Sequence, residues 1–185
     1  MAQAHAIDAA IKSLLKKLDY TFNDLSLLDE ALTHRSHAAI NNERLEFLGD
    51  GILNFVIAHE LFKQYPEVNE GDLSRLRANL VNKESLAEIA THLELGEVIK
   101  LGSGELKSGG FRRPSILADA VESIFGAVYC DGGFDVCRDL IVRLYKDRLA
   151  SPTDLQSLKD PKTRLQELLQ SRRFPLPTYE VTNIT

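Results

Sequence analysis

The sequence is poor in several features that mark particular classes of protein. It has only two cysteines, Cys130 and Cys137, and neither has a cysteine or histidine nearby at zinc-ligand spacing. It has no apolar run of membrane-spanning length, and its first residues follow an amphipathic pattern rather than that of a charged leader before an apolar block. We therefore expect reduced thiols, no zinc site, no membrane association and a cytoplasmic location.

An excess of positive charge is also absent. The chain has 22 lysines and arginines against 27 aspartates and glutamates, which gives a net charge of -5. This balance argues against a protein held to nucleic acid by bulk positive charge, so binding to nucleic acid would need bound cations or local basic patches. Lys107, Arg112 and Arg113 form one candidate patch, although ordinary solvated surface charge explains each of them equally well.

Strand-like patterns are missing from the first 150 residues, whereas helical periodicity is frequent. With 185 residues, the chain is long enough for one domain with a buried core and a smaller remnant. The glycine-rich segment GSGELKSGG at 102–110 predicts a flexible surface loop. Apolar spacing and breaker residues predict helices over 7–18, 24–32, 43–65, 70–81, 84–92, 114 to about 130, and 134–149.

The last part of the chain differs in composition. Residues 151–160 read SPTDLQSLKD, which is polar and poorly periodic, and they are followed by a helical pattern over 161–171 and a strand-like pattern over 178–185. One helix and one strand bury too little surface for a stable domain. We expect an all-α domain over 1–150, a linker over 151–159 and part of a smaller module over 160–185.

Two groups of acidic residues have helical spacing. Glu43, Glu46 and Asp50 lie on one stripe of the helix over 43–65, and Asp119 and Glu122 are three residues apart in the helix that follows residue 114. Apolar neighbours surround most of them, so the carboxylates would repel one another unless they bound protons or a cation. If the two helices cross here, Mg²⁺ or Mn²⁺ is the expected ligand, whereas an exposed helix face explains Glu43 equally well.

Two glycines accompany the first acidic group. Gly49 and Gly51 each cost about 1 kcal/mol in a helix interior relative to alanine. Close approach by a second backbone or by a ligand would explain why they are tolerated. The residues by themselves thus predict a metal–carboxylate site on helices, without naming a substrate.

At these residues the chain resembles a known family. The segment NERLEFLGDGIL at 42–53 resembles the signature of the ribonuclease III family. Further segments resemble the bacterial enzyme in the same order, namely ALTHRS at 31–36, EGDLSRLRANLV at 70–81, GELKSGGFRRPSILADAVES at 104–123 and DPKTRLQELLQ at 160–170. The resemblance implies an all-helical endonuclease domain that dimerises, then a linker and the first helix and strand of an α+β double-stranded-RNA-binding domain, which would be incomplete at Thr185.

The resemblance also implies an activity and its residues. The activity is magnesium-dependent hydrolysis of double-stranded RNA to 5′-phosphate and 3′-hydroxyl ends with short 3′ overhangs, in the processing of rRNA and other transcripts. Manganese would substitute for magnesium. The implied roles are catalysis for Asp50 and Glu122, metal binding for Glu46, Asp119 and Glu122, support for Glu43 and Glu70, and RNA binding for Thr163, Gln166 and Glu167. Phe47 and Leu48 would contribute to the seam of a homodimer.

Two other functions fit parts of the sequence. A catalytically silent relative that only binds double-stranded RNA would have lost the carboxylates of the site. This chain keeps the four that the resemblance assigns to catalysis and metal binding, namely Glu46, Asp50, Asp119 and Glu122. A different helical metal phosphohydrolase acting on nucleotides would depend on histidine ligands. His34, His37, His59 and His92 do not lie at ligand spacing with the acidic residues, so the endoribonuclease is favoured.

Overall fold

The computed structural model describes residues 2–150, 161–175 and 177 of the chain. It contains two compact units, Met1–Ser151 and Pro152–Thr185. The second unit carries α10 (Pro161–Ser171), which matches the helix expected over 161–171. The expected linker and the expected strand over 178–185 lie outside the described residues, so the domain boundaries stay predictions.

The first unit is built from helices, which confirms the all-α class. Its longer helices are α1 (Ala2–Leu18), α2 (Leu25–Ala31), α3 (Glu43–Gln64), α4 (Glu70–Leu80), α5 (Lys83–His92) and α7 (Pro114–Leu144), followed by α8 (Lys146–Ala150). Asp24, Asn69 and Asn82 begin α2, α4 and α5 as N-caps whose side chains accept a hydrogen bond from a backbone N–H of the first turn. β-Pairing in the described residues is limited to one isolated bridge between Thr33 and Lys100.

The segment over 102–110 is more ordered than its glycines indicate. It contains a short helix, α6 (Ser103–Lys107), and a 3-10 turn, η2 (Gly110–Arg112), so the expectation of a flexible loop is wrong. Arg113 explains the difference, since its Nη1 lies 2.8 Å from Glu105 Oε2 and its Nη2 donates to Ser108 Oγ. A second 3-10 turn, η1 (Leu95–Glu97), has no counterpart among the expected elements.

The break expected between residues 130 and 134 is present inside α7. Gly133 has φ 82° and ψ −179°, while the backbone on both sides of it is helical. This positive φ favours glycine because a side chain is strained there. The chain therefore turns at Gly133, and the two parts of α7 correspond to the two helices that the sequence predicted.

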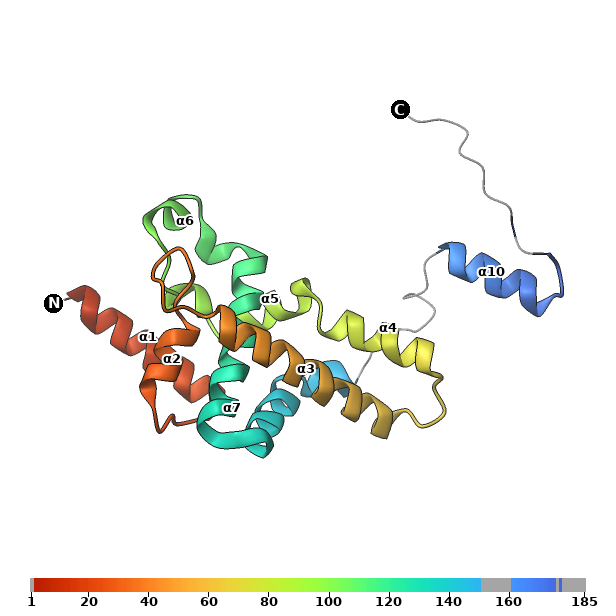
Figure 1. The fold of residues 1–185 in the computed structure, drawn as a ribbon, viewed down its shortest axis with the longest axis horizontal. Helices are drawn as coiled ribbons and strands as arrows, with labels where there is room; N and C mark the ends of the chain where they lie inside the picture. Colours follow the sequence, from red (N-terminus) through yellow and green to blue (C-terminus); the bar gives the residue numbers. More distant parts are fainter. Residues whose placement is uncertain (1, 151–160, 176, 178–185) are drawn as a thin grey trace, which may run out of the picture. The chain divides into compact units, whose positions relative to one another are not determined.

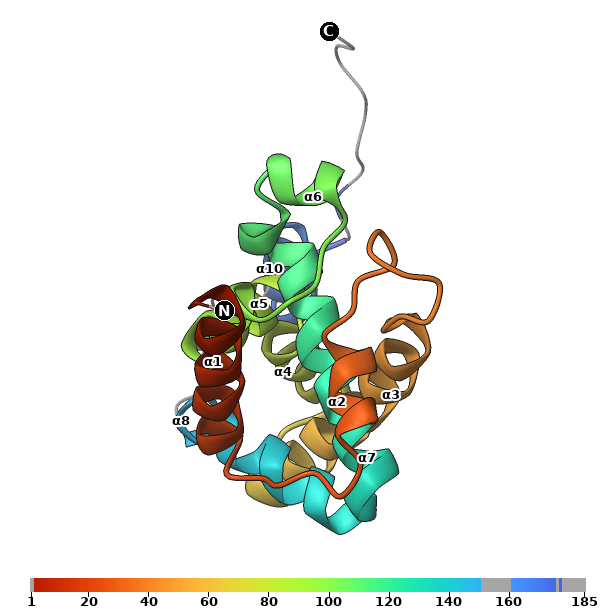
Figure 2. The same ribbon diagram turned by 90° about the vertical axis from the view of Figure 1, so that its left-hand side faces the viewer.

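The centre of the first unit is the crossing of α3 and α7, which Figures 1 and 2 show from two sides. A Cβ added to Gly49 would lie 1.8 Å from the backbone oxygen of Glu122, and one added to Gly126 would lie 2.2 Å from that of Leu45. Gly49 thus permits the backbone approach that its position in the sequence predicted. Gly51 does not, because a Cβ there would meet nothing within 4 Å.

One side of α3 is exposed to solvent. Leu53 and Ile57 are fully buried, but Phe47, Phe55 and Phe62 are 83%, 59% and 71% exposed. The second half of α3 is therefore buried on one side only, and the other side presents aromatic rings to solvent. None of the helices in the described part of the chain combines the length and apolar character needed to cross a bilayer.

Candidate active site

The α3–α7 crossing brings three carboxylates together. Glu46 of α3 and Asp119 and Glu122 of α7 each place a carboxylate oxygen within 4.8 Å of the others, and all three residues are partly buried. The backbone contacts at Gly49 and Gly126 set this spacing, because they hold the two helices closer than side chains would allow. Oxygen ligands from carboxylates suit a hard divalent cation.

Burial and mutual repulsion make these carboxylates hard to ionise. Burial raises the pKa of Glu122 to about 8, with further contributions from the charges of Asp50, Asp119 and Glu46. Burial also raises the pKa of Glu46, assisted by Asp119 and Glu43, and the pKa of Asp119, which His34 opposes. Such a cluster holds either protons or a cation near neutral pH. The donor set and its spacing fit magnesium or manganese.

Asp50 lies beside this group rather than in it. It is exposed to solvent on α3, one helical turn beyond Glu46, and it is not among the three carboxylates whose oxygens lie within 4.8 Å of one another. Asn54 Nδ2 donates to Asp50 Oδ1 at 2.7 Å and so holds its carboxylate in one orientation. After burial, the charge of Asp50 is the next largest cause of the raised pKa of Glu122.

A polar pocket of about 240 Å³ continues from the cluster toward the start of α3. Glu46 and Asp119 line it at one end, and the remaining lining residues are His34, Arg35, Asn42, Glu43, Glu105, Arg113, Ser115 and Ile116. Glu43 is exposed, and its Oε1 lies 3.3 Å from Arg35 Nη1. This position agrees with the alternative explanation of Glu43 as a residue on an exposed helix face. The pocket thus places cationic groups close to two carboxylates of the cluster.

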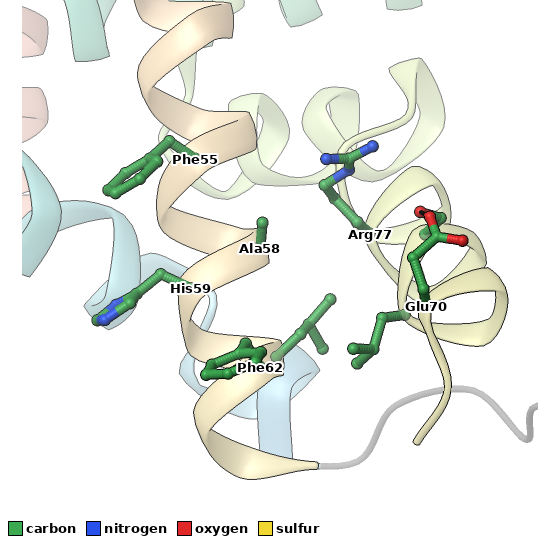
Figure 3. A pocket seen from close by; sticks show the side chains of 9 residues that line it. Phe55, Ala58, His59, Phe62, Glu70 and Arg77 are labelled. Atoms are coloured by element: carbon green, nitrogen blue, oxygen red, sulfur yellow. Dashed lines mark hydrogen bonds between the residues drawn. The ribbon is translucent and has the colours of Figure 1, made fainter. Parts of the chain in front are cut away.

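Glu70 belongs to another part of the surface. It lies at the start of α4 and accepts a hydrogen bond from Ser74 Oγ at 2.8 Å. Figure 3 shows it across from Phe62 and near Arg77, in a pocket between α3 and α4 of about 410 Å³. Within this chain Glu70 is therefore not brought together with Glu46, Asp119 and Glu122.

Of the other expected contact residues, Arg113 lines the polar pocket beside the cluster, and the rest are exposed on α6 and η2 or belong to the second unit. Lys107 and Arg112 are exposed on α6 and η2, whereas Arg113 is paired with Glu105. Thr163, Gln166 and Glu167 fall within α10. Their expected role in binding RNA stays a prediction.

Three polar residues of the site were not identified from the sequence. Asn54 supports Asp50, and its spacing of four residues in a helix was the available signal. Ser123 Oγ donates to the backbone oxygen of Asp119 at 2.6 Å and approaches that of Asn42 at 3.3 Å, which ties α7 to the start of α3. Asn42 itself is nearly completely buried at the pocket. No pattern in the sequence distinguishes Ser123 or Asn42 from an ordinary core or capping residue.

Comparisons with known proteins agree with this architecture. The model of the family described as Ribonuclease-III-like matches residues 24–149. Ribonuclease 3 of Alkalilimnicola ehrlichii is 63% identical over 174 residues, covering 94% of this chain and 76% of that protein. Ribonuclease 3 of Vibrio atlanticus is 59% identical over 178 residues, covering 96% and 79%.

Solved structures give the same result. The nuclease domain of ribonuclease III from Campylobacter jejuni superimposes with a TM-score of 0.74 at 44% identity, over 76% of this chain and 99% of that one. The family match includes both helices of the carboxylate cluster and most of the first unit. The chain therefore belongs to the ribonuclease III family and is an endoribonuclease of that type.

Proposed function

We propose that this endoribonuclease hydrolyses double-stranded RNA in a magnesium-dependent reaction, leaving 5′-phosphate and 3′-hydroxyl ends with short 3′ overhangs. The observation that carries the proposal is the group formed by Glu46, Asp119 and Glu122, whose carboxylate oxygens lie within 4.8 Å of one another. Magnesium bound there supplies a Lewis acid for the phosphodiester and its leaving oxygen. Manganese is expected to substitute, because it accepts the same oxygen ligands.

The residues of the site have distinct proposed roles. Glu46, Asp119 and Glu122 hold the cation, and its remaining coordination positions are open to water and to the RNA phosphate. We assign Asp50 and Glu122 as the catalytic pair, because Glu122 is one of the three clustered carboxylates and Asp50, one helical turn beyond Glu46, is open to solvent and substrate. Asn54 keeps the Asp50 carboxylate oriented. Glu43 and Glu70 have supporting roles.

The acidic net charge is compatible with this substrate. A chain with a net charge of -5 repels RNA unless positive charge is concentrated locally. The cation at the cluster gives one such point, and Lys107 and Arg112 of the exposed α6–η2 segment give another. Thr163, Gln166 and Glu167 of α10 are proposed to contact the minor groove, where shape and 2′-hydroxyls identify double-stranded RNA.

We further propose that the chain forms a homodimer. The Campylobacter jejuni nuclease domain has a region involved in dimer formation. In this chain an apolar groove of about 390 Å³ is lined on α3 by Phe47, Leu48, Asp50, Gly51, Ile52 and Phe55 and on α7 by Tyr129 and Phe134. Within this groove Phe47 is 83% exposed, and Gly51 has no side chain that would obstruct a partner. A Cβ added to Gly51 would meet nothing within 4 Å. A second copy would bury these groups and would place two active sites on one duplex, which gives the overhangs.

The cellular role follows from the activity. Cleavage of both strands of a duplex suits the processing of rRNA and other transcripts that contain paired segments. We place this activity in the cytoplasm, which is supported by two cysteines that form no disulfide with each other.

The test is cleavage of a long RNA duplex with magnesium, with manganese and with a chelator. We expect cleavage with either metal, none with the chelator, and none in Glu122→Gln, whose fold should be intact. Glu67→Gln, an exposed acid in the α3–α4 connection, is the matched control and should cut normally. Sequencing of the product ends checks the 5′-phosphate and the overhang. Cleavage by Glu122→Gln, or cleavage in chelator, would overturn the proposal.

A further inference from the structure

Asn42 carries a polar group that the fold leaves without a partner. Its side chain is 2% exposed, and its Nδ2 has no hydrogen-bond partner. A buried N–H without an acceptor costs free energy, and the great majority of buried polar atoms avoid this state. Among the described residues, Tyr145 Oη is the other buried side-chain atom in this condition. Unlike Tyr145, Asn42 lines the pocket that is continuous with the carboxylate cluster.

Capping of α3 does not explain the asparagine. An N-cap asparagine normally accepts a hydrogen bond from a backbone N–H of the first turn. Asn42 precedes α3, but its side chain makes no such bond. Its backbone instead connects the start of α3 to the preceding loop. The Asn42 N–H donates to Thr33 O at 2.9 Å, and the Asn42 carbonyl accepts from Glu46 N at 2.8 Å. Those bonds are available to almost any residue, so the amide side chain needs another explanation.

The amide is positioned to reach Glu46. Asn42 has helical dihedral angles, φ −76° and ψ −11°, so Asn42 and Glu46 are related as residues i and i+4 of one helix. Side chains at this spacing are neighbours on the same face. Both residues line the same pocket, and Glu46 is one of the three carboxylates of the cluster. An ionised carboxylate that gives one oxygen to a cation still has acceptor sites on the other, and donors there hold such ligands in place.

We propose that Asn42 is a positioning residue, whose Nδ2 donates to the Glu46 carboxylate when a divalent cation occupies the cluster. The inference rests on the proposed metal site at Glu46, Asp119 and Glu122. It assigns the unpaired amide a function that appears only in the metal-bound protein. Without metal, the unpaired amide lowers the stability of the folded protein. With metal bound, its hydrogen bond to Glu46 raises the affinity for the cation.

The test measures metal binding without RNA, using the full chain and Mn²⁺ as the probe. Asn42→Leu replaces the amide with an apolar side chain of similar size. Asn41→Leu is the matched control for loss of an asparagine at the start of α3, because Asn41 does not line the pocket. Its Nδ2 donates to the carbonyls of Ala38 and Ala39, and its Oδ1 accepts from Glu43 N at 3.1 Å, so its loss should lower the melting temperature without a direct effect on the cluster. Thermal unfolding is followed over a range of Mn²⁺ concentrations, and calorimetry gives the dissociation constant.

The expected result is an Mn²⁺ affinity at least about ten-fold weaker in Asn42→Leu, the usual scale for loss of an outer-shell donor. Its metal-free melting temperature should equal or exceed that of the wild type, because an unpaired donor is removed. Asn41→Leu should keep the wild-type affinity. Asn42→Ala provides a second variant in case leucine prevents folding, and only its expected loss of Mn²⁺ affinity is the same, because the cavity that it leaves lowers the melting temperature.

A merely structural role for Asn42 gives the opposite pattern. It predicts a lower metal-free melting temperature and an unchanged Mn²⁺ affinity in Asn42→Leu, and this result would overturn the inference. Absence of Mn²⁺ binding by the wild type would reject the metal site itself, and with it the role of Asn42. The two failures are therefore distinguishable.

Discussion

Among the carboxylates of the proposed site, Glu122 has the most strongly raised pKa. Its pKa is raised to about 8 from an ordinary 4.5, first by burial and then by Asp50, Asp119 and Glu46. The folded metal-free protein therefore binds this proton more tightly than the unfolded chain does. The resulting stabilisation is complete below about pH 4.5 and is lost as the pH rises through about 8.

This linkage predicts how stability responds to pH and metal. Between pH 5 and pH 9 the metal-free melting temperature of the wild type should fall more than that of Glu122→Gln, whose amide cannot ionise. At pH 9 the variant should be the more stable protein. Added Mg²⁺ should raise the wild-type melting temperature most at high pH, where the carboxylates are free to bind it. Parallel pH dependence of the two proteins in differential scanning calorimetry would contradict the prediction.

The residues of the site differ in how well they could be predicted from the sequence. Glu46, Asp119 and Glu122 could be selected because acids at helical spacing among apolar neighbours are costly, and the structure brings them together. Asn42 and Ser123 could not, because their importance depends on the contact between α3 and α7. Glu70 was selected only by resemblance, and within one chain it stands in a separate pocket. Long-range contacts of this kind leave no local pattern.

At the scale of elements, the crossing of α3 and α7 depends on two glycines. Gly49 lies against the backbone of Glu122, and Gly126 lies against that of Leu45. The same contacts hold the carboxylates at their spacing. A side chain at either position must push the helices apart, which disturbs both the core and the site.

We therefore expect Gly49→Ala to lower the free energy of unfolding by about 3 kcal/mol or more, at the upper end of the cost of overpacked cores. Gly104→Ala is the control, because a Cβ in that α6 position meets nothing within 4 Å. It should be neutral or should stabilise by up to ~1 kcal/mol through helix propensity. Chemical denaturation of both variants measures the difference. Equal free energies of unfolding for the two variants would mean that the backbones of α3 and α7 are not in close contact at Gly49.

The helices were largely predictable, since their periodicity, caps and breakers are local signals. Gly133 illustrates this, because it lies between the helices predicted to end at about 130 and to begin at 134, and the structure breaks α7 there. The segment over 102–110 was not predictable from its glycines, because Arg113 orders it from outside the segment. Exposure of Phe55 was not predicted, since apolar residues on a helix are equally compatible with a core and with a contact surface. Phe47 was placed on the surface only by the resemblance, which assigns it to a dimer seam.

For the whole molecule, the three proposed metal ligands are separate from the proposed dimer surface, whereas Asp50 lines the apolar groove of that surface. All the carboxylates assigned to catalysis and metal binding come from a single chain, and Glu46, Asp119 and Glu122 face the α3–α7 crossing. Phe47 is 83% exposed and lines the apolar groove rather than the polar pocket of the cluster. Loss of the dimer should therefore leave metal binding intact while changing how a duplex is cut.

The last prediction uses this separation. Phe47→Ser should shift the chain from dimer to monomer in sedimentation velocity at micromolar concentration, because the ring would be buried only against a second copy. Gly51→Leu should act in the same direction, since a side chain there meets nothing in its own chain but would obstruct a partner. Phe174→Ser is the control, because Phe174 is also exposed but belongs to the second unit. Both disruptive variants should keep the wild-type Mn²⁺ affinity and should nick one strand rather than release fragments with paired overhangs. A wild-type monomer, or a Phe47→Ser protein that remains dimeric, would show that this surface does not join two copies.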